Sequence, residues 1–201
     1  YLMLMLGLCV SLGSCNTKGP GCTDPQANNT VAGASENDGT CTYDEFWLGP
    51  VKTMVLDESL SGTSGLISWS GRIWTHNDHE DPRLYGLDSA TAEISIEYLL
   101  SGVVNTDWED MAEDGEYIYV GDFGNNATGN RTDLHILRIE MASLLSGNPV
   151  IDTIWFAYSD QTDLSPVAPN QTEFDCEAFV VSSTQIFLFT KQWLTGQTTL
   201  Y

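Results

Sequence analysis

The chain of 201 residues carries 28 Asp and Glu against 7 Lys and Arg, which gives a formal net charge of -21 at pH 7. A field of this sign repels nucleic acid and anionic membrane surfaces, so neither is expected to bind the chain directly. The charge indicates either a solvated acidic surface or a surface that concentrates cations, and composition leaves both open.

Residues 1–15, YLMLMLGLCVSLGSC, join an apolar run to a group of small residues. Such a run is too short to cross a bilayer as a helix and is typical of a signal peptide, here without its basic leading region. Leu12-Gly13-Ser14-Cys15 resembles the bacterial lipobox, which implies that Cys15 carries lipid and begins the mature protein. An ordinary secretory peptide cleaved nearby is the alternative. We therefore predict a cell-envelope protein, facing the periplasm or the exterior and touching the membrane only through its lipid, or else a secreted protein.

The five cysteines fit an oxidising compartment. Cys9 would be removed with the signal peptide and Cys15 would carry lipid, which leaves Cys22 and Cys41 as the expected disulfide pair. Cys176 remains on a predicted strand, where we expect a small buried hydrophobe.

Residues 16–44 are predicted to form a linker and a small polar module bracketed by Cys22 and Cys41. Its two ends, GCTDPQANN and NDGTCTY, resemble a short Cys-bracketed repeat of secreted proteins from marine Bacteroidetes. A disulfide that closes about 20 residues would stabilise such a module by about 3 kcal/mol. Asp24, Asn37 and Asp38 are either calcium ligands or turn formers.

Residues 45–201 repeat one order of elements: a strand, a tight turn, a second strand, a polar loop and a third strand. The order occurs in Gly65–Asp88 and in Asp107–Glu140, and it returns in Cys176–Tyr201. A fourth strand follows each of the first two units, at Ile94–Tyr98 and Ile151–Tyr158.

Units of four antiparallel strands at a period of about 40 to 50 residues predict an all-β fold, a β-propeller, with a sandwich of similar strands as the alternative. The period is uneven, and the surplus residues fall in loops predicted at 141–150 and 159–174. Two complete blades and part of a third cannot close a ring of about 4 to 8 blades, so we expect a partial propeller truncated at the C-terminus. Residues 51–56 are predicted as an additional outer strand.

In an antiparallel unit, the start of the first strand and the end of the second strand lie at the same end of the sheet. This rule gathers carboxylates and amides on one face, and their oxygen atoms are ligands that suit Ca²⁺. The candidate metal ligands are Asp78, Asp107, Glu109, Asp122, Asn125, Asn126, Asp175 and Glu177. Turn formation and hydrogen bonding at strand starts are their alternative roles.

Nucleophilic catalysis has little support, because the sequence contains no G-x-S-x-G motif and Cys176 has no nearby His. Glu109 and Glu177 are candidates for a general acid and base if the fold brings them together. His76 is a further catalytic candidate. Its H-x-x-H spacing with His79 lacks another Cys or His nearby, which disfavours zinc.

Four motifs in order, WTHND, LYGLD, DWEDMA and YVGDFGNN, resemble a group of largely uncharacterised secreted bacterial β-propellers. The likeness covers residues 63–140, with a fainter echo at 174–201. It implies a propeller whose matched polar positions form the functional face, and it implies no settled activity. More distantly, the chain is similar to phytase-like and gluconolactonase-like propellers, in which acidic residues on one face bind calcium.

Two functions follow from these patterns. The first is a surface-anchored binding or scaffolding propeller that binds calcium and an extracellular protein or small molecule. The second is a metal-dependent extracellular hydrolase acting on a phosphate ester or a lactone through the same carboxylates.

Overall fold

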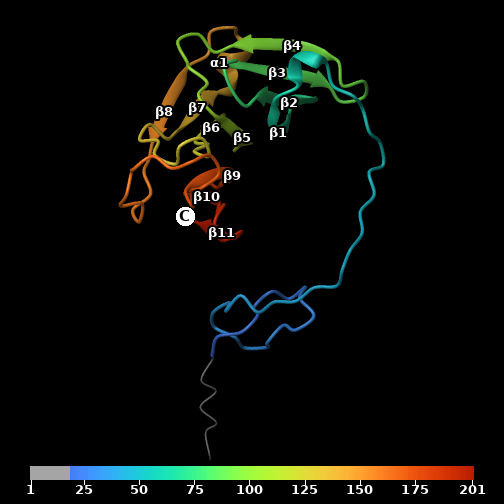
Figure 1. Cartoon of the computed structure of the whole chain (residues 1–201). Coiled ribbons are helices and arrows are strands. Elements are labelled where there is room, and N and C mark those ends of the chain that lie inside the picture. Colours follow the sequence, from blue (N-terminus) through green and yellow to red (C-terminus); the bar gives the residue numbers. More distant parts are fainter. Residues whose placement is uncertain (1–18) are drawn as a thin grey trace, which may run out of the picture. The chain divides into compact units, whose positions relative to one another are not determined.

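The computed structural model describes residues 19–201 and separates the chain into two compact units, Tyr1–Lys52 and Thr53–Tyr201 (Figure 1). The predicted signal peptide and Cys15 lie outside the described residues. Within the described part of the chain, no helix has the length and apolar character needed to cross a membrane.

The first unit, described over residues 19–52, consists of turns closed by a disulfide. The predicted Cys22–Cys41 disulfide is present. The carboxylate of Asp24 accepts hydrogen bonds from the Gln26 amide at 2.8 Å and from the Tyr43 hydroxyl at 2.6 Å. Asp38 accepts one from the Thr40 amide at 3.0 Å. In this unit, hydrogen bonds from side chains take the place of the backbone hydrogen bonds between strands that a sheet would supply.

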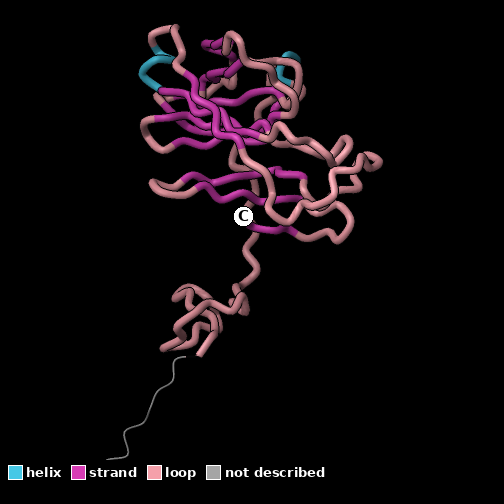
Figure 2. The backbone as a smooth tube through the Cα atoms, turned by 90° about the vertical axis from the view of Figure 1, so that its left-hand side faces the viewer, coloured by secondary structure: helices cyan, strands magenta, loops and turns pink. Residues whose placement is uncertain are grey.

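The second unit is all-β, as predicted, and consists of three antiparallel sheets (Figures 1 and 2). The first sheet is β1 (Thr63–Trp69), β2 (Arg72–Asn77), β3 (Arg83–Asp88) and β4 (Ile94–Leu99). The second is β5 (Trp108–Glu113), β6 (Tyr117–Asp122), β7 (His135–Glu140) and β8 (Ile151–Trp155). The third is β9 (Asp175–Val181), β10 (Ile186–Lys191) and β11 (Thr198–Leu200).

The β1–β2 hairpin shows how local sequence sets this order. Trp69 pairs with Arg72, so Ser70 and Gly71 alone make the turn, and both have positive φ, 50° and 72°. A two-residue turn of this kind matches the right-handed twist of the flanking strands. The tight turn predicted between the first two strands of the unit Gly65–Asp88 is therefore confirmed, and it lies at Ser70 and Gly71.

Three details of the prediction were wrong. Residues 51–56 form no strand, because their backbone finds no sheet partner in the described chain, and the short 3-10 helix η1 (Glu58–Leu60) follows them. The predicted loop 141–150 begins with α1 (Met141–Leu145), which buries Met141 and Leu144, three residues apart, against the core. The strand predicted to reach Tyr158 ends at Trp155.

The first strands of the three sheets lie side by side, with β1 next to β5 and β5 next to β9. The contact between β1 and β5 is close: a Cβ on Gly65 would lie 2.3 Å from the Met111 nitrogen. Apolar side chains fill both spaces between neighbouring sheets. Between the first two sheets these include Ile67, Trp74, Trp108, Met111 and Ile118, and between the last two Tyr119, Phe123, Phe179 and Leu188.

Candidate functional site

The starts of β5 and β9 bring four carboxylates to one end of the sheets. Strand register makes the two starts equivalent, since Glu113 pairs with Ile118 in one hairpin and Val181 pairs with Ile186 in the other. Counting back from these pairs along each hairpin makes Asp107 equivalent to Asp175 and Glu109 equivalent to Glu177. We call these four residues the acidic cluster.

Gly124, in the loop after β6, lies directly against the acidic cluster. A Cβ at Gly124 would lie 2.4 Å from Asp107 Oδ2 and 2.5 Å from Glu109 Oε1. Both carboxylates therefore face the same point of the backbone, and only glycine leaves them room there.

Burial and like charge raise the pKa values of Asp107, Glu109 and Asp175. Burial and the charges of Glu177 and Asp107 raise the pKa of Glu109 to about 9. Burial raises the pKa of Asp107, although the charge of Arg131 opposes the shift. Burial also raises the pKa of Asp175 to about 6. Glu109 therefore holds a proton at neutral pH unless a cation replaces it.

The two halves of the cluster differ in their hydrogen bonds. Asp175 accepts from the Asn125 amide at 2.6 Å and from Trp193 Nε1 at 2.7 Å, and Lys191 Nζ donates to Glu177 Oε1 at 3.0 Å. The carboxylates of Asp107 and Glu109 accept no hydrogen bond from any residue in 19–201, although the Glu109 carbonyl accepts one from Ser64 Oγ at 2.5 Å. These two carboxylates are therefore the ones with oxygen atoms free for a ligand.

Asp122 is buried and serves a different purpose from the acidic cluster. It pairs with Arg131 at 2.7 Å and accepts hydrogen bonds from the amides of Thr106 and Asp107, at 3.0 and 3.3 Å. Arg131 also donates to the Gly124 carbonyl at 2.8 Å. The ion pair thus positions both the Asp107 backbone and the Gly124 loop. The sequence offered no signal for this pairing, because the loop residues 123–130 separate the partners.

Asn125 and Asn126 shape the same loop. Asn125 Oδ1 accepts from the Arg131 amide at 3.0 Å, and Asn125 Nδ2 donates to the Phe174 carbonyl at 3.0 Å. The Asn126 carbonyl accepts from the Asn170 amide at 2.8 Å. The Asn125 side chain is therefore occupied in joining the second sheet to the segment before β9.

Asp78 and His76 come from the first sheet. A Cβ on Gly62 would lie 2.5 Å from Asp78 Oδ1, and the charge of Asp78 contributes to the raised pKa of Glu109. Asp78 also contacts His79 Nδ1 at 2.5 Å. His76 is buried edge-on against Trp108, with ring centroids 5.5 Å apart, and burial lowers its pKa. Asp78 borders the acidic cluster, whereas His76 packs between sheets.

A cavity of about 230 Å³ adjoins the cluster at Asp107. Its lining residues are Thr106, Asp107, Asn125, Ala127, Thr128 and Arg131. Across residues 19–201, no three His, Cys, Asp or Glu side chains already stand in an arrangement that would hold a metal ion. No protein-family model matches the chain, and no curated protein matches it.

Proposed function

We propose that residues 53–201 belong to a β-propeller that acts as an extracellular, surface-anchored binding or scaffolding module. Three antiparallel sheets with adjacent first strands support this architecture. The anchor is the lipid on Cys15, and the partner is an extracellular protein or small molecule. The acidic cluster binds a divalent cation, calcium, at the end of the sheets.

The observation that carries the calcium proposal is the pair Asp107 and Glu109, whose carboxylates converge on Gly124 without a hydrogen-bond donor. Glu177 and Asp175 add further like charge to Glu109. Calcium takes six to eight oxygen ligands in flexible geometry, so carboxylates and waters suit it. Because burial and like charge favour protonated Glu109 in the absence of an ion, calcium binding at these carboxylates displaces the proton of Glu109.

A second candidate is a metal-dependent hydrolase for a phosphate ester or a lactone. The raised pKa of Glu109 suits a general acid, and Glu177 supplies a second carboxylate as base. The cavity beside Asp107 offers room for a small substrate. A bound cation would supply Lewis-acid polarisation of the substrate oxygen.

Calorimetric titration of the full chain with CaCl₂ tests the proposal. We expect binding that weakens at least tenfold in the Glu109→Gln, Glu177→Gln double variant and is unchanged in Glu97→Gln, a control on the exposed edge of β4. Incubation with p-nitrophenyl phosphate and a δ-lactone then separates the two functions. Turnover that Glu109→Gln abolishes favours the hydrolase, calcium binding without turnover favours the binding module, and no calcium binding contradicts the site.

A further inference from the structure

One row of side chains crosses the second sheet at the end that carries the acidic cluster. Strand pairing joins Trp108 to Asp122, Asp122 to His135 and His135 to Trp155, and paired residues share a face. This face points toward the first sheet, because Trp108 belongs to the apolar layer between the two sheets. Trp108 is fully buried, whereas Trp155, on the edge strand β8, is 64% exposed. No other aromatic side chain of residues 53–201 is as exposed.

A cavity of about 350 Å³ lies beside Trp155, between the outer part of this row and the segment that connects β4 to β5. Thr106 lines both this cavity and the one beside Asp107. Small-molecule sites have volumes of this order and combine apolar walls with a few polar groups. The residues that line the cavity include Val104, Thr106, Asp133, His135, Thr153 and Trp155.

His135 fixes the position of the Trp155 ring. The two ring centroids lie 4.6 Å apart, with the ring planes at 38°. His135 Nδ1 donates to the Asp133 carbonyl at 2.8 Å, and His135 Nε2 lies 3.9 Å from Asp122 Oδ2. The imidazole therefore supports the indole, which stays largely exposed. An aromatic ring that is held before a ligand arrives loses little conformational entropy on binding.

The polar groups of the cavity suit the hydroxyl groups of a ligand. Thr106 and Thr153 carry hydroxyls, which both donate and accept hydrogen bonds. The Asp133 side chain is 55% exposed, and Asp133 Oδ1 accepts from Arg131 Nε at 3.0 Å. This ion pair offsets the carboxylate charge, which weakens attraction for an organic cation. A cage for a quaternary ammonium ion is built from aromatic rings, and apart from His135 this lining has a single one, Trp155.

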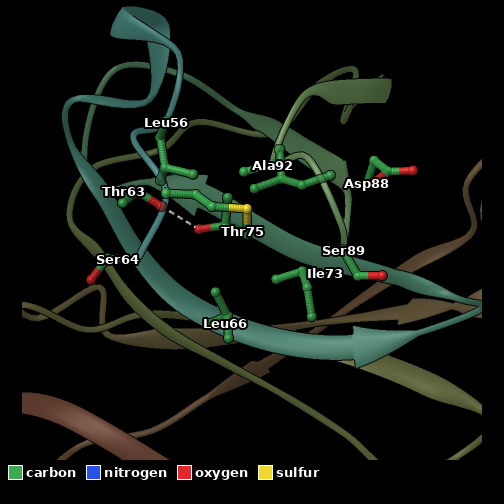
Figure 3. Close-up of a pocket in the computed structure, with 11 residues that line it drawn as sticks. Leu56, Thr63, Ser64, Leu66, Ile73, Thr75, Asp88, Ser89 and Ala92 are labelled. Carbon is green, nitrogen blue, oxygen red and sulfur yellow. Dashed lines mark hydrogen bonds between the residues drawn. The ribbon is translucent and has the colours of Figure 1, made fainter. Parts of the chain in front are cut away.

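The cavity over the first sheet has a different chemistry. It occupies about 320 Å³ over β1, β2 and β3, and Leu56, Leu66 and Ile73 line it (Figure 3). The Thr63 and Thr75 hydroxyls in its lining hydrogen-bond each other. None of the described residues that line it is aromatic. It therefore lacks the exposed ring that distinguishes the cavity at Trp155.

We propose that the cavity at Trp155 binds a neutral pyranose sugar of an extracellular glycan. The C–H groups on one face of a pyranose are weakly positive and are attracted to the negative face of an indole ring. Hydroxyls at the sugar edge then bond Asp133, Thr106 and Thr153. The net charge of -21 disfavours an acidic sugar. This inference names the ligand class of the proposed binding module and so rests on that function, but it does not depend on the calcium site.

NMR of the full chain labelled with ¹⁵N-tryptophan tests this proposal. The six Trp residues give six indole signals, and Trp155→Phe identifies the one from Trp155. The probes are the methyl β-glycosides of glucose, galactose and N-acetylglucosamine, each added to about 50 mM, because one stacked ring and a few hydrogen bonds give dissociation constants near 1 mM. We expect at least one sugar to shift the Trp155 signal and to leave the signal of the buried Trp108 in place.

Variants then separate stacking from nonspecific contact, with binding read as saturation transfer to the sugar protons. Trp155→Ala should weaken binding at least about tenfold, through loss of the stacked ring. Thr153→Val, which keeps the side-chain shape, should weaken it about threefold. Trp47→Ala removes another exposed indole, outside residues 53–201, and should leave binding unchanged.

The sugar proposal and the calcium proposal fail separately. The Glu109→Gln, Glu177→Gln double variant should still bind the sugar, and Trp155→Ala should still bind calcium. A Trp155 signal that none of the three sugars shifts, or sugar binding that survives in Trp155→Ala, would overturn the proposal. A Trp155 signal that responds to tetramethylammonium chloride and to no sugar would replace it with a cation site.

Discussion

In residues 19–52 the carboxylates of Asp24 and Asp38 accept hydrogen bonds within turns, whereas in residues 53–201 the carboxylates of Asp107 and Glu109 accept none from the described chain. The Tyr43 hydroxyl lowers the pKa of Asp24, and burial raises the pKa of Glu109. The charge of -21 therefore combines two kinds of acid. Carboxylates in turns accept hydrogen bonds from their neighbours, whereas those of Asp107 and Glu109 are buried beside like charge.

The two units also differ in what stabilises them. Residues 19–52 depend on one disulfide and on turn hydrogen bonds, whereas residues 53–201 depend on apolar layers between sheets. Removing a buried charge should therefore change the stability of the second unit most, because burial strengthens electrostatic interactions. Breaking the disulfide should change the stability of the first unit most.

The largest effect is expected from breaking the buried ion pair. Asp122→Ala removes the buried partner of Arg131, which keeps only its pair with the exposed Asp133, and also removes acceptors for two backbone amides. The free energy of unfolding should therefore fall by about 3 to 5 kcal/mol. Urea unfolding measures it. Asp152→Ala removes a comparable but exposed pair with Arg138 and should cost less than about 1 kcal/mol. Equal losses in the two variants would contradict the structural role given to Asp122.

Removing the disulfide should act on the first unit alone. Cys22→Ser with Cys41→Ser should destabilise residues 19–52 by about 3 kcal/mol through the entropy of the opened loop. Hydrogen exchange read by mass spectrometry should show faster exchange there and unchanged exchange in β5 and β6. Faster exchange in those strands would mean that the two units are not independent.

Glu109 should make stability depend on pH. Its folded pKa of about 9 exceeds the unfolded value of 4.5, so the native state binds more protons and the free energy of unfolding falls as pH rises between these values. In EDTA, Glu109→Gln should remove this slope and stabilise the protein at pH 9 by at least about 1.4 kcal/mol, the equivalent of one pKa unit. Urea unfolding at pH 6 and 9 provides the comparison. A slope that survives in the variant would place the titrating group elsewhere.

The smallest effect is expected in the turns. Hydrogen bonds hold the pKa values of Asp24 and Asp38 below the ordinary value of 3.8, so their contribution to stability is present above that pH and is lost as pH falls. Carbon-detected NMR titration should find both groups ionising below pH 3.8 and Glu109 ionising well above pH 6. Similar pKa values for all three would remove the distinction between the two kinds of acid.

Much of the fold was predictable, because it rests on local patterns. The alternation of Ile94–Tyr98 and the Gly71 turn each identified an element without reference to the rest of the chain. The strand prediction for residues 51–56 was wrong because a strand also needs a neighbouring strand to pair with, and local sequence does not show whether one is present. α1 was missed because five residues are too few to show a helical period.

The sequence predicted only that part of the candidate site which is determined by where the strands begin. The expectation that strand starts share one end of the sheet is met by four carboxylates at equivalent strand positions, those of Asp107, Glu109, Asp175 and Glu177. Which oxygen atoms remain free depended on tertiary contacts, such as the approach of Gly124 and the pairing of Asp122 with Arg131. Residue type alone does not separate Asp122, which is fully paired, from Asp107, which is not.

The most direct test of the calcium site is a count of the protons released when the ion binds. Calcium titrations at pH 7.5 in two buffers of different ionisation enthalpy give this number. Because the pKa of Glu109 lies near 9, we predict the release of about one proton per ion, and no release by Glu109→Gln. Calcium binding without proton release, or release that persists in the variant, would contradict the assignment of the ion to this carboxylate.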